Sequence, residues 1–150
     1  MFQVRDLNRE DAEAIADIHA ISLEEAWSAD AIRETIEQDA SISLGIQTGN
    51  VWFAFLILLP AVDDVELATI AVHPEARGQG MARFLMIEAM AHARRAGFQR
   101  MLLEVAADND AAISLYQSLG FGVDGTRPGY YSRKHAARVD ARLMSINLCV

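Results

Sequence analysis

The segment Ile70-Ala71-Val72-His73-Pro74-Glu75-Ala76-Arg77-Gly78-Gln79-Gly80-Met81-Ala82 carries the clearest structural signal in the chain. An apolar, β-rich run ends at Pro74, a short polar turn follows, and two glycines precede an amphipathic helix. A turn of this kind leaves backbone N–H groups unpaired at the positive end of a helix dipole. Gly78 and Gly80 allow a ligand to approach the backbone closely, and Arg77 can donate hydrogen bonds to phosphate. The segment therefore predicts a seat for a pyrophosphate group.

Apolar periodicity on either side of this turn predicts the remaining elements. The helix that follows it has apolar residues at i, i+3 and i+4 and ends at Gly97. In chain order the prediction is a strand at 2–5, a helix beginning near 8, a helix at 28–37, strands at 41–47, 51–59 and 65–72, a helix at 80–97, a strand at 101–106, a helix at 109–119, and strands at 121–126 and 142–148 joined by a polar loop.

This order, β-α-α-β-β-β-α-β-α-β-β, predicts an α/β (α+β) fold with a mixed sheet and helices on both faces. The chain has 150 residues, which is long enough to bury a core, and no Pro/Gly/Ser-rich linker divides it. We therefore expect a single domain spanning residues 1–150.

Composition limits the partners of this domain. The net charge of −8 argues against a nucleic-acid binder, because a phosphate backbone must be met with Lys and Arg. No apolar run approaches the roughly 20 residues that cross a bilayer, and no export signal is visible. The lone cysteine, Cys149, favours a reducing compartment. We expect a cytoplasmic protein, a monomer or weak homodimer, with neither a nucleic-acid nor a membrane partner.

Three kinds of nucleotide ligand use a glycine-rich turn before a helix. A P-loop requires Gly-Lys-Ser/Thr, whereas Met81 and Ala82 follow the glycines here. A dinucleotide-binding fingerprint requires a third glycine where Arg83 stands, and it normally opens the sheet, whereas this turn comes after most of the predicted strands. The third ligand is coenzyme A.

The turn resembles that of a known enzyme family. Arg77-x-x-Gly80-x-Ala82 is similar to the Arg/Gln-x-x-Gly-x-Gly/Ala loop of the GNAT acetyltransferases. The resemblance implies the GNAT fold, whose mixed sheet is mostly antiparallel, and acetyl-CoA as co-substrate without a metal. It implies that backbone groups of Ile70, Ala71 and Val72 contact the pantetheine arm. It also implies that the pyrophosphate is wrapped by Arg77, Gly78, Gln79, Gly80, Met81, Ala82 and Arg83.

Three polar residues downstream of the turn are candidates for chemistry. Glu104 lies in the middle of an apolar strand, which indicates either a structural salt bridge or a reacting group. Asn109 opens the next helix, either as a plain cap or as a contact to an amide-rich ligand such as pantetheine. Tyr116 on that helix is either apolar filling or a proton donor.

The surrounding motif resembles one GNAT branch in particular. Leu103-Glu104-Val105, Asn109, and Leu115-Tyr116-x-x-x-Gly120-Phe121 are similar to the enzymes that acetylate the N-terminal alanine of ribosomal protein S18. This resemblance implies that Glu104 is the general base, Tyr116 the general acid and Asn109 a contact to the co-substrate. Arg127-x-x-Tyr130-Tyr131 also resembles the branch, and its tyrosines are expected to bind the backbone of an incoming peptide. The alternative interpretation of these tyrosines is an aromatic cluster that closes the sheet.

The predicted reaction is direct acetyl transfer to a primary amine. Glu66 is the rival base, since other GNAT branches use the preceding strand, and it would face the same cleft if it aligned with Ala68 and Ile70. Cys149 lacks an identifiable base, and the four histidines lack ligand spacing, so we expect neither a covalent route nor a metal site. This chain differs from the branch pattern in two places. Glu25-Ala26 precede Trp27-Ser28 where the branch usually has Phe-Pro, and Thr69 stands where the branch commonly has Asn.

Two other functions remain open from the sequence. One is a GNAT enzyme that acetylates a small amine such as an amino acid, polyamine or aminoglycoside. The other is a non-catalytic acyl-CoA sensor, which would need the glycine-rich turn but not Glu104 and Tyr116 together. Tyr130 and Tyr131 favour a protein N-terminus as the acceptor over a small amine.

Overall fold

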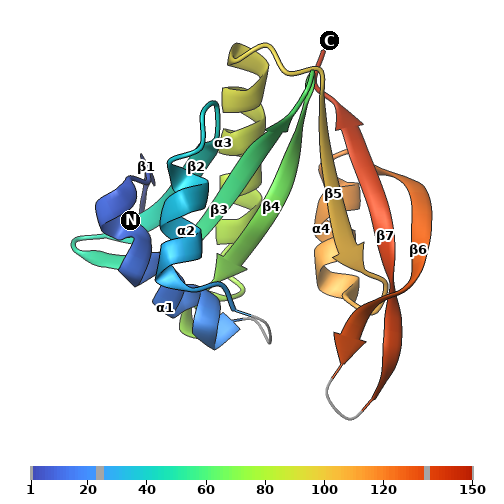
Figure 1. Ribbon diagram of the computed structural model, residues 1–150, viewed down its shortest axis with the longest axis horizontal. Coiled ribbons are helices and arrows are strands. Elements are labelled where there is room, and N and C mark those ends of the chain that lie inside the picture. The colour runs from blue at the N-terminus through green and yellow to red at the C-terminus, as the bar shows by residue number, and fades with distance from the viewer. Residues whose placement is uncertain (1, 23–25, 134–135, 150) are drawn as a thin grey trace.

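The protein is described by a computed structural model that covers residues 2–22, 26–133 and 136–149. Seven strands form one sheet in the order β1-β2-β3-β4-β5-β7-β6, and helices cover it on both faces (Figure 1). The strands are β1 Gln3–Asp6, β2 Ile42–Thr48, β3 Val51–Ala61, β4 Asp64–Val72, β5 Arg100–Ala106, β6 Gly122–Arg133 and β7 Ala136–Asn147. The helices are α1 Ala12–Ser22, α2 Ala29–Ile36, α3 Met81–Arg95 and α4 Asp110–Ser118, with 3₁₀ turns η1 Arg9–Asp11 and η2 Pro74–Ala76. The predicted order of elements is confirmed.

The sheet is antiparallel except between β4 and β5. The parallel pairing there joins Val65 to Met101 and Glu66 to Leu102, at the start of both strands. Toward their carboxyl ends the two strands diverge, which is visible in Figure 1 as they descend from the top of the view. The sheet is therefore divided into β1–β4 and β5–β7–β6, which join only at one end.

Each face of the sheet carries its own hydrophobic cluster. The larger cluster lies under α3 and α4 and includes Leu85, Met86, Leu103 and Tyr116. The smaller cluster lies under α1 and α2, in front of β2–β4 in Figure 1, and includes Ile15, Ile32, Phe55 and Ala71. Side chains of successive strand residues alternate between these clusters, as the period of a strand requires.

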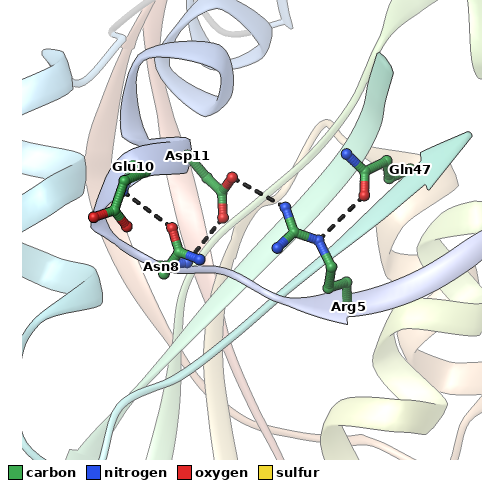
Figure 2. A network of polar contacts seen from close by, with 5 residues as sticks. All are labelled: Arg5, Asn8, Glu10, Asp11 and Gln47. Carbon is green, nitrogen blue, oxygen red and sulfur yellow. Dashed lines mark hydrogen bonds and ion pairs between the residues drawn. The ribbon is translucent and has the colours of Figure 1, made fainter. Parts of the chain in front are cut away.

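The start of the helical region is fixed by a small polar network (Figure 2). Asn8 and Asp11 form a capping box, in which the Asn8 N–H donates to Asp11 Oδ2 at 2.9 Å. Arg5 on β1 donates to Asp11 Oδ1 and to Gln47 Oε1 on β2, each at 3.1 Å. The predicted helix start at Asn8 is thus confirmed, although its first turn is the 3₁₀ turn η1.

A β-bulge interrupts β4 in its middle. Ile57 of β3 pairs with Thr69, but the next residue, Leu58, pairs with Leu67, which leaves Ala68 without a counterpart. An extra residue reverses the alternation of side chains beyond it. Leu67 lies in the cluster under α3, and Thr69 hydrogen-bonds to α1 on the opposite face.

The last two strands are much longer than predicted. The segment expected to be a polar loop after residue 126 is strand up to Arg133, and β7 begins at Ala136 rather than near 142. Pro128 and Gly129 indicate a loop from sequence alone, yet here they lie in an irregular stretch of an edge strand. Edge strands and bulges are where a sheet tolerates Pro. The prediction of a loop was wrong because an irregular edge strand can accommodate Pro128 and Gly129.

Candidate active site

The glycine-rich turn joins β4 to α3 with two residues in the left-handed conformation. Gly78 and Gly80 both have φ of +80°, a region that side chains with a Cβ rarely adopt. Gly80 is the N-cap of α3 and supplies no side-chain hydrogen bond, so the first turn of α3 keeps N–H groups available. Arg77 is exposed, and its Nε donates to the Val72 carbonyl at 3.3 Å, which folds the guanidinium back toward the strand end. The turn therefore has the geometry of an anion seat.

The end of β4 offers backbone groups toward β5. The His73 N–H donates to the Phe53 carbonyl of β3 at 2.7 Å. Because backbone groups alternate along a strand, those of Ala71 also face β3, and those of Ile70 and Val72 face the divergence between β4 and β5. Ser22 on α1 donates to the Val72 carbonyl at 3.3 Å, which brings the end of α1 to the same place. Ile70 and Val72 are thus the members of the predicted trio with backbone groups directed away from β3.

Two residues predicted to contact the co-substrate, Asn109 and Arg83, make hydrogen bonds at opposite ends of α4. Asn109 is its N-cap, and its Oδ1 accepts from the Ala112 N–H at 3.2 Å, so its Nδ2 group keeps two hydrogens to donate. Arg83, in the first turn of α3, donates to Ser118 Oγ at the other end of α4 at 2.7 Å. This bond ties the glycine-rich turn on one half of the sheet to the helix on the other.

Glu104 forms an ion pair, one of the two alternatives that the sequence left open, with a partner that was not predicted. Its Oε1 lies 3.1 Å from Nη2 of Arg127 on β6, and the side chains are 22% and 49% exposed. Leu103 and Val105 belong to the cluster under α3 and α4, so Glu104 lies on the opposite, α1–α2 face of β5. The carboxylate is therefore neither buried without a partner nor free in solvent.

Aromatic contacts continue from Arg127 to the predicted acid. The Arg127 guanidinium lies over the ring of Tyr130 at 4.7 Å, and Tyr130 contacts Tyr131 edge to face at 5.0 Å. Tyr116 is buried, and its pKa is raised to about 12 by that burial and by the nearby phenol of Tyr131. The structure thus joins Glu104, Arg127, Tyr130 and Tyr131 in one chain of contacts, with Tyr116 near the phenol of Tyr131.

An acidic residue on β7 holds the irregular stretch that carries these tyrosines. Three residues of β6, at 128–130, stand against Asp140 alone in the pairing with β7. Asp140 Oδ1 accepts from the N–H of Gly129, whose φ is +59°, at 2.9 Å. The sequence pattern assigned a contact neither to Arg127 nor to Asp140. Their partners depend on the register of β5, β7 and β6, which the sequence pattern does not specify.

The rival base, Glu66, lies at the closed end of the sheet. It is exposed and pairs with Leu59 of β3 and Leu102 of β5, before the two halves diverge. The bulge at Ala68 places Glu66 on the opposite face of β4 from Ile70, whose side chain packs in the cluster under α3. The alignment with Ile70 is therefore absent, but Glu66 lies on the same α1–α2 face as Glu104, so the choice between the two bases stays a prediction.

Other chemistry has little support in the described parts of the chain. No three His, Cys, Asp or Glu side chains among those residues gather closely enough to hold a metal ion. Cys149 is exposed near the end of the described chain, and His135 lies outside the described residues. In the same residues, none of the helices has the length and apolar character of a membrane span.

Comparison with known proteins gives concordant results. Residues 12–121 match the Acetyltransferase (GNAT) family. A ribosomal protein bS18-alanine N-acetyltransferase of Escherichia coli K12 is 38% identical over 93 residues, which is 62% of this chain and 62% of that relative. The crystal structure of the ribosomal-protein-S18-alanine N-acetyltransferase from Escherichia coli superimposes with a TM-score of 0.93 at 28% identity, over 100% of this chain and 96% of that one. Ard1 from Thermoplasma volcanium shares the fold, with a TM-score of 0.89 at 22% identity over 99% of both chains.

Proposed function

The chain belongs to the GNAT family of acetyl-CoA-dependent N-acetyltransferases, and we propose that its acceptor is the N-terminal α-amino group of a protein of the bS18 type, beginning with alanine. The observation that carries this proposal is the chain of contacts from Glu104 through Arg127 to Tyr130 and Tyr131, whose phenol lies near Tyr116. It unites a candidate base and a candidate acid with a surface suited to a peptide. The similarity to bS18-alanine N-acetyltransferases supports the same acceptor.

A peptide acceptor is favoured over a small amine by Tyr130. This residue is 46% exposed, although its ring contacts both Arg127 and Tyr131. An exposed phenol beside a reaction centre can hydrogen-bond the amide groups that follow the first residue of a peptide. A small amine has no such groups, so this surface would contribute nothing to its binding.

The co-substrate is expected to lie between the diverging strands. Acetyl-CoA supplies a thioester whose acetyl group is open to attack by an amine. The turn from Arg77 to Arg83 has the N–H groups and charge to hold its pyrophosphate, and Asn109 Nδ2 can donate to the amides of its arm. The backbone of Ile70 and Val72 faces the same space. The Val72 N–H is the candidate donor to the negative charge that develops on the acetyl oxygen.

Glu104 is proposed to take the proton from the acceptor. An α-amino group has a pKa of about 8, so most of it is protonated at neutral pH and must lose a proton before it attacks. Arg127 binds Oε1 of Glu104, which leaves Oε2 as the oxygen available to the ammonium group. Arg127 also anchors Tyr130, so the base and the peptide surface are held by one guanidinium.

Tyr116 is proposed to assist departure of the thiolate. With a pKa of about 12, its phenol keeps its proton at neutral pH and is available as a donor. A thiol has a pKa of about 8.5, so full transfer to the thiolate is uphill while each group keeps that acidity. We infer that Tyr116 first stabilises the leaving sulfur by a hydrogen bond, and that burial of the thiolate beside it brings the two acidities closer.

The experiment that tests the proposal is an acetyl-transfer assay with a panel of acceptors. Thiol release from acetyl-CoA is followed with an alanine-initiated bS18-type peptide, the same peptide with a blocked N-terminus, and a set of amino acids, polyamines and aminoglycosides. Mass spectrometry then locates the acetyl group. We expect the free-ended peptide alone to react, on its α-nitrogen.

Other outcomes of this assay would contradict the proposal in distinct ways. Turnover with small amines and none with the peptide would retain the enzyme class and refute the acceptor. Acetylation of lysine side chains in the blocked peptide would refute N-terminal specificity. Binding of acetyl-CoA with no turnover on any acceptor would favour the acyl-CoA sensor.

A further inference from the structure

His19 is a buried titratable residue that the proposed mechanism does not use. It lies on α1 with only 1% of its surface exposed, against the rings of Trp27 and Phe55 at 5.4 Å and 5.9 Å. Its Nε2 lies 3.0 Å from Thr69 Oγ1 on β4, and its Nδ1 accepts from the Trp27 N–H at 3.0 Å. One imidazole therefore joins three separate parts of the chain.

The contact to Trp27 determines the protonation of the ring. A backbone N–H can only donate, so Nδ1 of His19 must present a lone pair to it. In the neutral imidazole the single proton is then on Nε2, which donates to Thr69 Oγ1. The Thr69 hydroxyl keeps its own hydrogen to donate elsewhere.

His19, Trp27 and Thr69 lie on the face of the sheet from which an acceptor would reach Glu104. Glu104 is on the α1–α2 face of β5, and beyond the bulge Thr69 is on the same face of β4. Ser22, at the end of α1, bonds to the Val72 carbonyl at the end of β4. An amine that delivers its proton to Glu104 therefore approaches along α1 and the start of α2, whose N-cap Ser28 directly follows Trp27.

We propose that His19 is a positioning residue for the acceptor, because its neutral imidazole fixes the start of α2 at Trp27 against Thr69 on β4. This inference rests on the proposed acetyltransferase function and adds to it the residue that sets one wall of the acceptor entrance. His19 touches no reacting atom in this scheme and acts through Trp27 and Thr69. It follows that its loss weakens acceptor binding more than binding of acetyl-CoA.

Protonation of His19 would break its hydrogen bond to Trp27 and free the start of α2 from β4. A proton on Nδ1 would face the Trp27 N–H, so the hydrogen bond between them would be lost. Burial lowers the pKa of His19, and its partners on β3, β4 and before α2 are the uncharged Phe55, Thr69 and Trp27. The adjoining elements α1, α2 and β4 carry charged residues that are exposed or half-buried: Glu13, Asp17, Asp30, Arg33, Glu34, Asp64 and Glu66.

Two amide variants separate the two hydrogen bonds of His19. In His19→Asn, Oδ1 takes the place of Nδ1 and can still accept from Trp27, whereas the bond to Thr69 is lost. In His19→Gln, the longer side chain reaches Thr69 but leaves Trp27 without an acceptor. Neither amide titrates, and Thr69→Val removes the second bond from the other side. His92→Gln on α3 is the matched control, since the His92 ring hydrogen-bonds to the Glu88 carbonyl of its own helix.

The variants should change the KM for the acceptor more than the KM for acetyl-CoA. With the alanine-initiated peptide at pH 7.5, His19→Gln should raise the acceptor KM by about three- to tenfold, the range for loss of one net hydrogen bond. The KM for acetyl-CoA should stay within about twofold, and His19→Asn should restore most of the acceptor KM. Equal increases in both KM values, or no difference between the Asn and Gln variants, would overturn the inference while leaving the acetyltransferase function intact. Thermal melting of each variant identifies any that fails to fold.

Nuclear magnetic resonance tests the same inference without turnover. In the ¹⁵N-labelled wild type, His19 should appear as the neutral tautomer with its proton on Nε2. The Trp27 amide resonance should shift as His19 is protonated on lowering the pH, and this shift should be absent from His19→Asn. A proton on Nδ1 at neutral pH, or a Trp27 amide that ignores the titration, would overturn the proposal even if no acceptor were acetylated.

Discussion

At the scale of single residues, the pairing of Glu104 with Arg127 changes how the proton transfer must begin. The acceptor reaches Glu104 as a cation, and it meets a carboxylate that already has a cationic neighbour at 3.1 Å. One oxygen must serve each partner, or the ammonium must displace the guanidinium. In either case Arg127 helps to determine which acceptors can approach.

Replacing the carboxylate tests its role as base. Glu104→Gln should lower kcat with the peptide by about 10²-fold or more at pH 7, the contribution typical of general-base catalysis. The deficit should narrow near pH 9, where the α-amino group is already deprotonated. Acetyl-CoA affinity, measured by calorimetry, should change little.

The comparison variants for this test are Glu66→Gln and Glu13→Gln. A larger loss in Glu66→Gln than in Glu104→Gln would assign the base to β4. Glu13 is exposed on α1 and serves as the control for a neutralised carboxylate. A deficit in Glu104→Gln that does not depend on pH would indicate a role in holding Arg127 rather than in proton transfer.

At this scale the sequence predicted residue types better than contacts. An apolar strand interrupted by Glu104 indicated either a salt bridge or a reacting group, and the structure shows a salt bridge. Asn109 is the cap that its position predicted. Arg127 was not predicted as the partner of Glu104, because their contact crosses β7 and depends on the pairing register. The proximity of Tyr131 to Tyr116 was not predicted for the same reason.

At the scale of elements, the short turn between β4 and α3 has two structural roles. It must reverse the chain and it must present N–H groups, and both are met by glycines with positive φ. The spacing of glycines predicted this turn from the sequence because Gly is nearly the only residue that adopts the conformation at low cost. The length of β6 and β7 had no such local signal, since Pro128 and Gly129 lie in a stretch whose strand character depends on β7.

A substitution in this turn should weaken acetyl-CoA binding. In Gly80→Ala the new Cβ meets no atom within 4 Å, so the effect comes from forcing alanine to a φ of +80°. The cost of a left-handed conformation is about 1–2 kcal/mol. We expect the Kd for acetyl-CoA, measured by calorimetry, to rise by up to about tenfold as the turn relaxes toward other conformations.

The matched control is Gly49→Ala in the hairpin between β2 and β3. Gly49 has a φ of +59° and equally open surroundings, so its strain is comparable. It should lower the free energy of unfolding by a similar amount without changing the Kd for acetyl-CoA. Equal effects of both variants on that Kd would mean that the turn acts only through overall stability.

At the scale of the whole molecule, His19 links folding to pH. The ring is buried and its pKa is lowered from 6.5, so the unfolded chain binds a proton more readily than the folded one. The stabilisation from the neutral ring is therefore present above pH 6.5 and is lost as the pH falls from that value toward the lower folded pKa. The loss of stability at low pH should therefore arise in the smaller cluster under α1 and α2, beside which His19 is buried.

Urea unfolding followed by tryptophan fluorescence at several pH values measures this effect. Below pH 6.5 the free energy of unfolding of the wild type should fall with a slope that exceeds that of His19→Asn. For one proton the excess reaches at most about 1.4 kcal/mol per pH unit. Parallel curves for the two proteins would show that His19 titrates alike in the folded and unfolded states.

The divergence of β4 from β5 also bears on self-association. A sheet of seven strands ordinarily has two edges, but here the carboxyl halves of β4 and β5 are edges as well. Open edges invite other polypeptides to add a strand, and proteins usually guard them with charges, prolines or bulges. These two inner edges face each other and converge where Val65 and Glu66 pair with β5, so a strand added to one of them would approach the other. Backbone groups on these inner edges, such as the Val72 N–H, can thus face a ligand without lying on an outer edge of the sheet.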